Sequence, residues 1–149
     1  MPSSRKVKEK ILAQIPKDTK GDIYELGCGW GTLLFPVAKA HPDSRVTGYE
    51  YALIPWLYTQ VRQTFFPLKN ITLHKADFLE QSLENADIVI CYLYTGAMNA
   101  LQSKFEQELK PGTLVISNTF SLPQWKAEKT IVLDDLYRTR IYVYRKESS

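Results

Sequence analysis

The stretch that decides the fold is "DIYELGCGWG", residues Asp22 to Gly31. A strand-like run is followed directly by glycines at alternate positions, Gly27, Gly29 and Gly31. Because glycine has no Cβ atom, a backbone built this way can come within contact distance of a ligand. The stretch therefore predicts a ligand-binding turn at the end of a first β-strand.

Strand-like and helix-like segments alternate along the rest of the chain. The hydrophobic patterns predict seven strands, at residues 23–26, 45–49, 71–74, 86–93, 114–117, 130–133 and 140–144. They predict helices at residues 3–15, 32–40, 54–66 and 97–109. Alternation favours parallel pairing, because a parallel crossover needs a helix-length connection, whereas the last two strands are close enough for a hairpin. The expected fold class is α/β, a Rossmann-like, mostly parallel seven-stranded sheet with helices on both faces and an antiparallel C-terminal hairpin.

Length and composition favour a single domain over residues 1–149. With 44% hydrophobic and 23% charged residues the chain is globular in composition. We expect an amphipathic helix within residues 1–16, with a serine cap and Pro16 at its end, ahead of a ligand-binding core at 20–145. The net charge of +3 is too small to argue for a nucleic-acid partner. The two cysteines show no metal-ligand spacing, so no metal site is expected, and both fit small buried residues in a reducing compartment.

An acid at the end of the second predicted strand narrows the ligand. Glu50 follows Gly31 by 19 residues. At this place in an alternating α/β fold, a carboxylate can accept hydrogen bonds from both hydroxyl groups of a ribose. The glycine turn and Glu50 together predict a nucleoside-containing ligand.

The other acid, Glu25, stands two residues before the first glycine. A carboxylate there would repel a pyrophosphate by about 1 to 4 kcal/mol at a separation of about 4 Å. The dinucleotide fingerprint also needs a glycine where Thr32 stands, and no Gly-Lys-Ser/Thr follows as in a phosphate-binding P-loop. These features favour a phosphate-free nucleoside with cationic groups, and S-adenosylmethionine is such a ligand.

The pattern E-x-G-x-G-x-G at residues 25–31 resembles the signature of the class I S-adenosylmethionine-dependent methyltransferases. The stretches "KADF", "ADIVICYLY" and "LKPGTLVIS" resemble later motifs of that superfamily, in the same order. The resemblance implies the cofactor S-adenosyl-L-methionine, with S-adenosyl-L-homocysteine as product. It also implies a set of cofactor-binding residues, the last two of them at the adenine: Glu25, Gly27, Gly29, Gly31, Glu50, Asp77 and Phe78.

The acceptor side of the expected site is aromatic. Neither histidine, His41 nor His74, falls at the end of the fourth predicted strand, so no catalytic base is named. The stretch "CYLYTG" there lacks the amide and prolines typical of methyltransferases that act on DNA or amide nitrogen. Aromatic rings attract an ammonium group by about 0.5 to 2 kcal/mol. They also desolvate a lysine, which lowers its pKa and favours the neutral amine that attacks.

A narrower resemblance supports a lysine acceptor. The stretches "GYEYALIPWLYTQ", "VICYLYTGAMNALQSKFEQELKPGTLVISNTFSLPQW" and "RIYVYRK" are similar to the small seven-strand protein lysine methyltransferases. That group includes broad-specificity archaeal enzymes and mitochondrial enzymes that act on ATP synthase subunit c. The resemblance implies that Tyr92, Phe120 and Trp125 surround a lysine channel. The chain departs from the family at Trp30, where a small acid often stands.

Two other functions remain open on the sequence: a small-molecule N- or O-methyltransferase, and a non-catalytic cofactor-binding protein. The short segment before the first strand leaves no obvious lid domain, which favours a macromolecular acceptor such as a protein lysine. The chain as given is expected to be cytoplasmic. It begins almost directly on "PSSRKVKEKIL", which resembles the family's entry segment, so we expect membrane attachment only through a segment ahead of it. The oligomeric state is left open.

Overall fold

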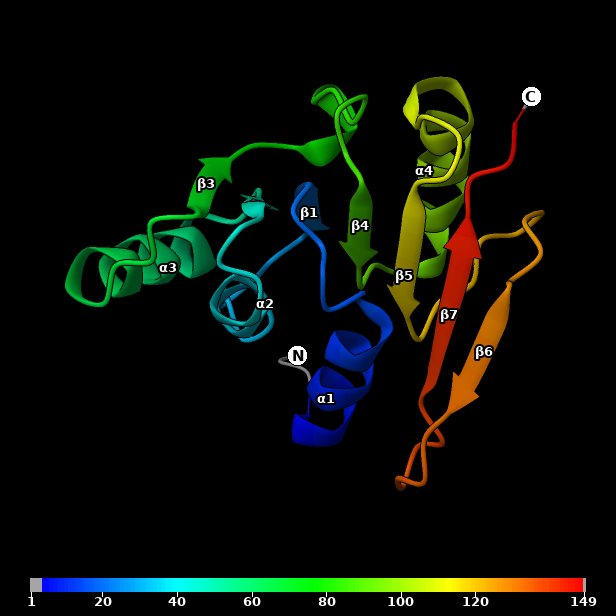
Figure 1. Cartoon of the computed structure of the whole chain (residues 1–149), viewed down its shortest axis with the longest axis horizontal. Helices are drawn as coiled ribbons and strands as arrows, with labels where there is room; N and C mark the ends of the chain where they lie inside the picture. Colours follow the sequence, from blue (N-terminus) through cyan, green and yellow to red (C-terminus); the bar gives the residue numbers. More distant parts are fainter. Residues whose placement is uncertain (1–3, 149) are drawn as a thin grey trace.

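The structure is a computed structural model that describes residues 4–148, and it contains one seven-stranded sheet between helices (Figure 1). The strand order is β3-β2-β1-β4-β5-β7-β6. The strands are β1 (Asp22–Leu26), β2 (Arg45–Glu50), β3 (Ile71–Lys75), β4 (Ile88–Cys91), β5 (Leu114–Asn118), β6 (Lys129–Val132) and β7 (Arg140–Arg145). The helices are α1 (Arg5–Gln14), α2 (Leu34–Ala40), α3 (Leu53–Phe65) and α4 (Thr95–Glu108), with a short 3₁₀ helix, η1 (Phe78–Glu80).

The sheet has the predicted fold class. Strands β1 to β5 pair in parallel, and β7 pairs antiparallel with both β5 and β6. Strands β2 and β3 are added on one side of β1, and β4 then pairs on its other side. Strands β1 and β4 are therefore neighbours in the sheet but not in sequence, and the strand order reverses between them. A change of strand order of this kind opens a crevice at the carboxyl ends of the strands. The fold therefore places a ligand-binding crevice between β1 and β4.

The core lies on both faces of the sheet because the central strands bury both of their faces. Along β4, Ile88 and Ile90 pack on one face with residues of α1 and α2. Val89 and Cys91 point to the opposite face and pack with residues of α4. This alternation follows from the two-residue period of side chains along a strand. Two apolar layers hold the central strands rigidly in place.

Three predicted elements differ from the structure by two residues at an end, and one of them is α4, which begins at Thr95 rather than at 97. The fourth strand was expected over residues 86–93, but β4 covers only Ile88–Cys91. Beyond Cys91 the chain leaves the sheet, because Tyr94 becomes the extended N-cap residue of α4. Helix α2 begins at Leu34 rather than at 32, after the left-handed turn at Gly31. A hydrophobic run does not reveal where the backbone leaves a sheet.

The N-terminal helix α1 has the expected cap. The Ser4 hydroxyl accepts a hydrogen bond from the Val7 amide at 3.3 Å, and the helix ends before Pro16. The expected helix start at residue 3 lies outside the described residues. Val7 and Ile11 are buried, so α1 is part of the core and not an appendage. Within residues 4–148, no helix combines the length and apolar character needed to cross a membrane.

Candidate active site

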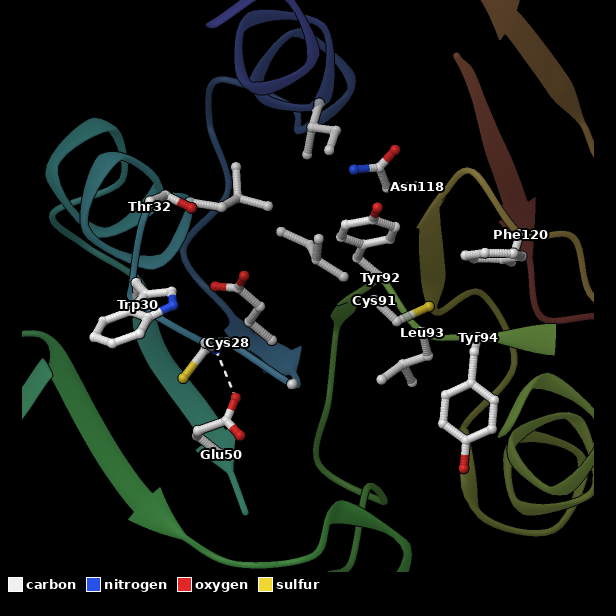
Figure 2. Close-up of a pocket in the computed structure, with 16 residues that line it drawn as sticks. Cys28, Trp30, Thr32, Glu50, Cys91, Tyr92, Leu93, Tyr94, Asn118 and Phe120 are labelled. Carbon is white, nitrogen blue, oxygen red and sulfur yellow. Dashed lines mark hydrogen bonds between the residues drawn. The ribbon is translucent and has the colours of Figure 1, made fainter. Parts of the chain in front are cut away.

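A cavity of about 390 Å³ lies at the carboxyl ends of the central strands, where the strand order changes (Figure 2). Residues from the glycine turn and the end of β2 line one side of it, and residues that follow β4 and β5 line the other. Its lining is formed by Ile11, Glu25, Gly27, Cys28, Gly29, Trp30, Thr32, Leu33, Glu50, Ile90, Cys91, Tyr92, Leu93, Tyr94, Asn118 and Phe120. The predicted ligand turn and the predicted aromatic segment therefore meet at one cavity.

The glycine turn is tied to the neighbouring strand through its backbone. The amides of Gly27 and Cys28 both donate to the Tyr49 carbonyl, at 2.9 and 3.0 Å. Gly27 and Gly29 have φ values of 72° and 54°, in the left-handed region where a side chain would strain the backbone. Both glycines line the cavity. The turn thus presents bare, rigidly held backbone to a ligand.

The third glycine has a different role. Gly31 also has a left-handed φ, 76°, but it does not line the cavity. A Cβ atom there would stand 2.5 Å from the Phe35 ring and 3.1 Å from the Thr59 methyl group. Gly31 is glycine because two helices, α2 and α3, pack against it.

Glu50 is held at the cavity by two backbone amides. Its Oε1 accepts from the Gly29 amide at 2.8 Å, drawn as a dashed line in Figure 2, and its Oε2 accepts from the Ala52 amide at 2.9 Å. Each carboxylate oxygen has a second lone pair for a further donor. The carboxylate therefore joins the glycine turn to β2 while it can still accept hydrogen bonds from a ligand.

Glu25, unlike Glu50, has a carboxylate oxygen that no backbone amide of the described part of the chain satisfies. Its carboxyl is buried, and its Oε2 has no hydrogen-bond partner among residues 4–148. Burial raises the pKa of Glu25 well above its usual value, and the nearby Glu50 carboxylate raises it further. A buried acceptor without a partner costs free energy until a donor satisfies it. The site thus fits a ligand that brings a cationic donor, such as the amino group of S-adenosylmethionine, to Glu25.

Aromatic side chains form the other side of the cavity. The rings of Tyr92 and Phe120 are nearly parallel, with centroids 6.2 Å apart and an interplanar angle of 19°. Tyr94 and the buried Asn118 complete this side, and Figure 2 shows Tyr92 and Asn118 next to each other. Two of the three expected channel residues, Tyr92 and Phe120, therefore line the cavity.

Trp125 lies elsewhere, which corrects its expected position at the channel. Its ring packs against Phe105 and Tyr144, with centroids 6.0 and 6.2 Å away, and its Nε1 donates to Glu106. It borders a separate surface cavity. The segment between β5 and β6 folds back over α4, and this long-range packing is not visible in the sequence pattern.

Asp77 and Phe78 follow β3 and do not line the cavity either. The Asp77 side chain caps η1 by accepting from the Leu79 amide at 3.0 Å. Phe78 packs partly buried against the core layer of α4. The preceding residue, Ala76, donates its amide to the Glu50 carbonyl at 3.2 Å, so this segment runs beside Glu50.

Several lining residues were not predicted as site residues. Ile11 of α1 and Asn118 at the end of β5 reach the cavity only through the tertiary fold. Cys28 and Trp30 lie within the glycine turn, and their position between the glycines was a signal that could have identified them. Burial raises the pKa of the Cys28 thiol, so Cys28 contributes a neutral group.

A second cavity, of about 600 Å³, adjoins the first and shares Tyr92 and Asn118 with it. It is bordered by Ser4 and Val7 of α1 and by the turn between β6 and β7, residues 135–140. Within this turn the Asp135 carboxylate accepts from both the amide and the hydroxyl of Thr139, at 2.8 and 2.6 Å. The second cavity thus opens from the aromatic side of the first, at Tyr92 and Asn118.

The strand order is that of the Rossmann-like fold of class I methyltransferases, and Glu25 and Glu50 line the cavity at the change of strand order. An RNA methyltransferase from Salinibacter ruber, solved in complex with S-adenosyl-L-homocysteine, has this fold. Its structure matches with a TM-score of 0.89 and 22% identity over 100% of this chain and 95% of that chain.

Sequence comparison identifies the family. A family model described as the ANTKMT methyltransferase domain matches residues 25–129, so the chain belongs to that family. The chain is 29% identical over 142 residues to a protein-lysine N-methyltransferase of Saccharolobus islandicus (strain REY15A), covering 91% of this chain and 84% of that protein. It is 28% identical over 127 residues to the adenine nucleotide translocase lysine N-methyltransferase of Mus musculus, covering 83% of this chain and 53% of that protein. These matches confirm the prediction of an S-adenosylmethionine-dependent class I methyltransferase.

Proposed function

We propose that this methyltransferase transfers a methyl group from S-adenosylmethionine to the ε-amine of a lysine in a protein. The observation that carries the proposal is a single cavity with carboxylates on one side and stacked aromatic rings on the other. The relatives named as protein lysine methyltransferases support the same acceptor.

On the carboxylate side, the chain offers a partner for each polar part of the cofactor. Glu50 would accept from the ribose hydroxyls, since its position is fixed by two amides. Glu25 would accept from the amino group, and Gly27 and Gly29 would allow close approach of the backbone. S-Adenosylmethionine, when bound, supplies an electrophilic methyl group on a sulfonium. The role of Asp77 and Phe78 at the adenine is part of the proposal, supported by the position of this segment beside Glu50.

On the aromatic side, Tyr92 and Phe120 would surround the acceptor amine and exclude water from it. Removal of water disfavours the charged ammonium and lowers the lysine pKa, so that the attacking lone pair becomes available. Within residues 4–148, the side chains that line this cavity include no lysine or histidine. The proton of the ammonium would therefore leave to solvent through the adjoining second cavity, which also gives a polypeptide a path to Tyr92.

Transfer of a labelled methyl group tests the acceptor class. The full chain is incubated with tritium-labelled S-adenosylmethionine and a lysate of cells that lack the protein. We expect label in protein and, after hydrolysis, in methylated lysine. Label confined to small molecules would instead support the small-molecule methyltransferase, and no incorporation would support a non-catalytic cofactor-binding protein.

Substitution of Tyr92 tests the aromatic side separately from the cofactor side. Tyr92→Ala is expected to leave S-adenosylmethionine affinity, measured by calorimetry, unchanged and to lower turnover at least about tenfold. Trp125→Phe is the matched control, because Trp125 lies outside the cavity and its loss is expected to leave turnover unchanged. An equal loss of affinity and turnover in Tyr92→Ala would place Tyr92 on the cofactor side and contradict the proposed channel.

A further inference from the structure

Helix α3 exposes an apolar face that the fold does not use. Six large apolar side chains on this helix and its last turn are exposed to solvent, with Phe65 and Phe66 exposed by 72% and 74%. We define the α3 face by these residues: Leu53, Ile54, Leu57, Val61, Phe65 and Phe66.

Five of these residues share one side of the helix by their spacing, and the sixth, Phe66, is the C-cap residue at its end. Leu53, Leu57, Val61 and Phe65 follow one another at intervals of four, which keeps side chains on one side of an α-helix. The opposite side faces the protein, because Thr59 is buried there and Arg62 stacks over the Phe35 ring at 4.1 Å. A surface helix of a globular protein normally turns its apolar stripe toward the core. Here an apolar stripe faces outward, and continuous exposed patches of this kind mark interaction sites.

Between Glu50 and Asp77, the segment that contains α3 has charged residues of one sign only. Residues 51–76 contain no aspartate or glutamate, and their charged residues are Arg62, Lys69 and Lys75. Lys69 and Lys75 are exposed, and the Lys75 ammonium lies 5.7 Å from the centre of the Tyr51 ring, which is itself exposed. Lys69 follows Phe66 by three residues, beyond the other end of the helix. Cations therefore accompany the apolar face at both of its ends.

The α3 face is also distinct from the rest of the molecule in position. Helix α3 lies at the β3 end of the sheet, opposite the β6–β7 end (Figure 1). Its Tyr58 ring contacts Trp30 edge-on, with centroids 5.3 Å apart, and Trp30 lines the active-site cavity. A surface that covers the α3 face would therefore reach the rim of the site.

We propose that the α3 face docks on the surface of an anionic phospholipid bilayer. An outward apolar stripe rich in leucine and phenylalanine, with lysines beside it, is the arrangement of helices that lie in a membrane interface. The anionic headgroups complement the lysines, each of which is worth about 1 kcal/mol near such a surface. A second copy of the chain is a poorer partner, because self-pairing of this face would bring its cations together with no acid in residues 51–76 to compensate them.

Vesicle binding tests the proposal without any reference to methyl transfer. The full chain is sedimented with vesicles of phosphatidylcholine alone or with about one-third phosphatidylglycerol. We expect binding to the anionic vesicles that weakens as salt is added. Ile54→Ser/Val61→Ser/Phe65→Ser is expected to weaken it at least about tenfold. The matched control is Val132→Ser/Leu136→Ser/Tyr137→Ser, which removes three exposed apolar side chains at the opposite end of the sheet and is expected to keep wild-type binding.

A charge variant keeps the test valid if the serine variant fails to fold. Lys69→Gln/Lys75→Gln is expected to weaken binding to anionic vesicles about fivefold per lysine. Lys17→Gln/Lys129→Gln has the same net charge and is expected to bind as the wild type. Absence of vesicle binding, or equal effects of test and control variants, would overturn the proposal. So would a wild-type dimer in sedimentation velocity that the α3 variant dissociates, because the face would then belong to a second copy.

Discussion

Glu25 and Glu50 are two carboxylates in one cavity with opposite surroundings. Glu50 accepts from two backbone amides, whereas the Oε2 of Glu25 is buried and has no partner among the described residues. The unpartnered Glu25 carboxyl therefore lowers the stability of the free protein, a cost that the proposed contact with the cofactor amino group would remove. Side chains whose surroundings cost the folded protein stability are typical of functional sites.

Substitution of Glu25 tests this conflict. Glu25→Gln removes the charge and keeps the size of the side chain. Because burial raises the pKa of Glu25, the ionised form is disfavoured in the folded state, and its removal is expected to increase the free energy of unfolding at neutral pH by about 1 kcal/mol. The same change is expected to weaken S-adenosylmethionine binding. Urea unfolding and calorimetry measure the two effects, and a loss of both stability and affinity would contradict the argument.

Because the pKa of Glu25 is raised, its contribution to the free energy of unfolding depends on pH. The folded-state pKa of Glu25 lies above its unfolded value, so its favourable contribution is complete below about pH 4.5 and is lost as pH rises through the folded-state pKa. The stability advantage of Glu25→Gln over the wild type is therefore expected to grow as pH rises from acidic to neutral. An advantage that shrinks over this range would mean that Glu25 is stabilised as the anion.

At the scale of the element, the glycine turn does two separate things. Gly27 and Gly29 present backbone to the cavity, whereas Gly31 lets α2 and α3 pack closely. A sequence pattern of three alternate glycines does not distinguish these roles.

Alanine substitutions at Gly31 and at Gly112, which lies between α4 and β5, separate the cost of backbone conformation from the cost of packing. Gly31→Ala and Gly112→Ala both place a side chain at left-handed φ, 76° and 90°. A Cβ at Gly112 meets no atom within 4 Å, whereas one at Gly31 meets the Phe35 ring. We expect Gly112→Ala to cost about 1 kcal/mol of stability and Gly31→Ala about 1 to 3 kcal/mol more, by urea unfolding. Equal costs would show that packing at Gly31 is unimportant.

The short helix η1 offers a test of the adenine position. Asp77→Ser keeps a capping hydroxyl, so we expect a change in stability below about 0.5 kcal/mol by thermal unfolding. Serine is too short to replace the carboxylate as an acceptor for adenine, so S-adenosylmethionine affinity is expected to fall about tenfold. Unchanged affinity would leave Asp77 with the capping role alone.

At the scale of the whole molecule, α1 connects the start of the chain to the site. Ile11 is fully buried, packs in the core layer on that face of the sheet and lines the active-site cavity. Val7, one turn earlier, is also buried but borders only the second cavity. The helix therefore contributes to both stability and the site.

Alanine substitutions at Ile11 and Val7 separate the contribution of α1 to stability from its contribution to the site. Ile11→Ala is expected to cost about 2 to 5 kcal/mol of stability and to lower S-adenosylmethionine affinity. Val7→Ala is expected to cost less stability and to leave that affinity unchanged. Urea unfolding and calorimetry on both variants give the comparison, and equal affinities for the two would remove Ile11 from the site.

The sequence by itself determined the fold class, the cofactor type and the two acids. Alternating segments require a parallel sheet, and the glycine turn with Glu25 and Glu50 lies within or beside strands whose register follows from a two-residue period. These features depend on local spacing, and the structure has them close to where they were predicted.

Only the tertiary structure decided the acceptor side and the surfaces. Trp125 has the same aromatic character as Phe120 in the sequence, yet it packs on α4 while Phe120 lines the cavity. The α3 pattern reads as an ordinary amphipathic helix, and only the packing of Thr59 against the protein shows that the apolar stripe faces outward. Such outcomes depend on which distant residues fill the same space, and a periodic pattern fixes a helix face without fixing the direction in which it points.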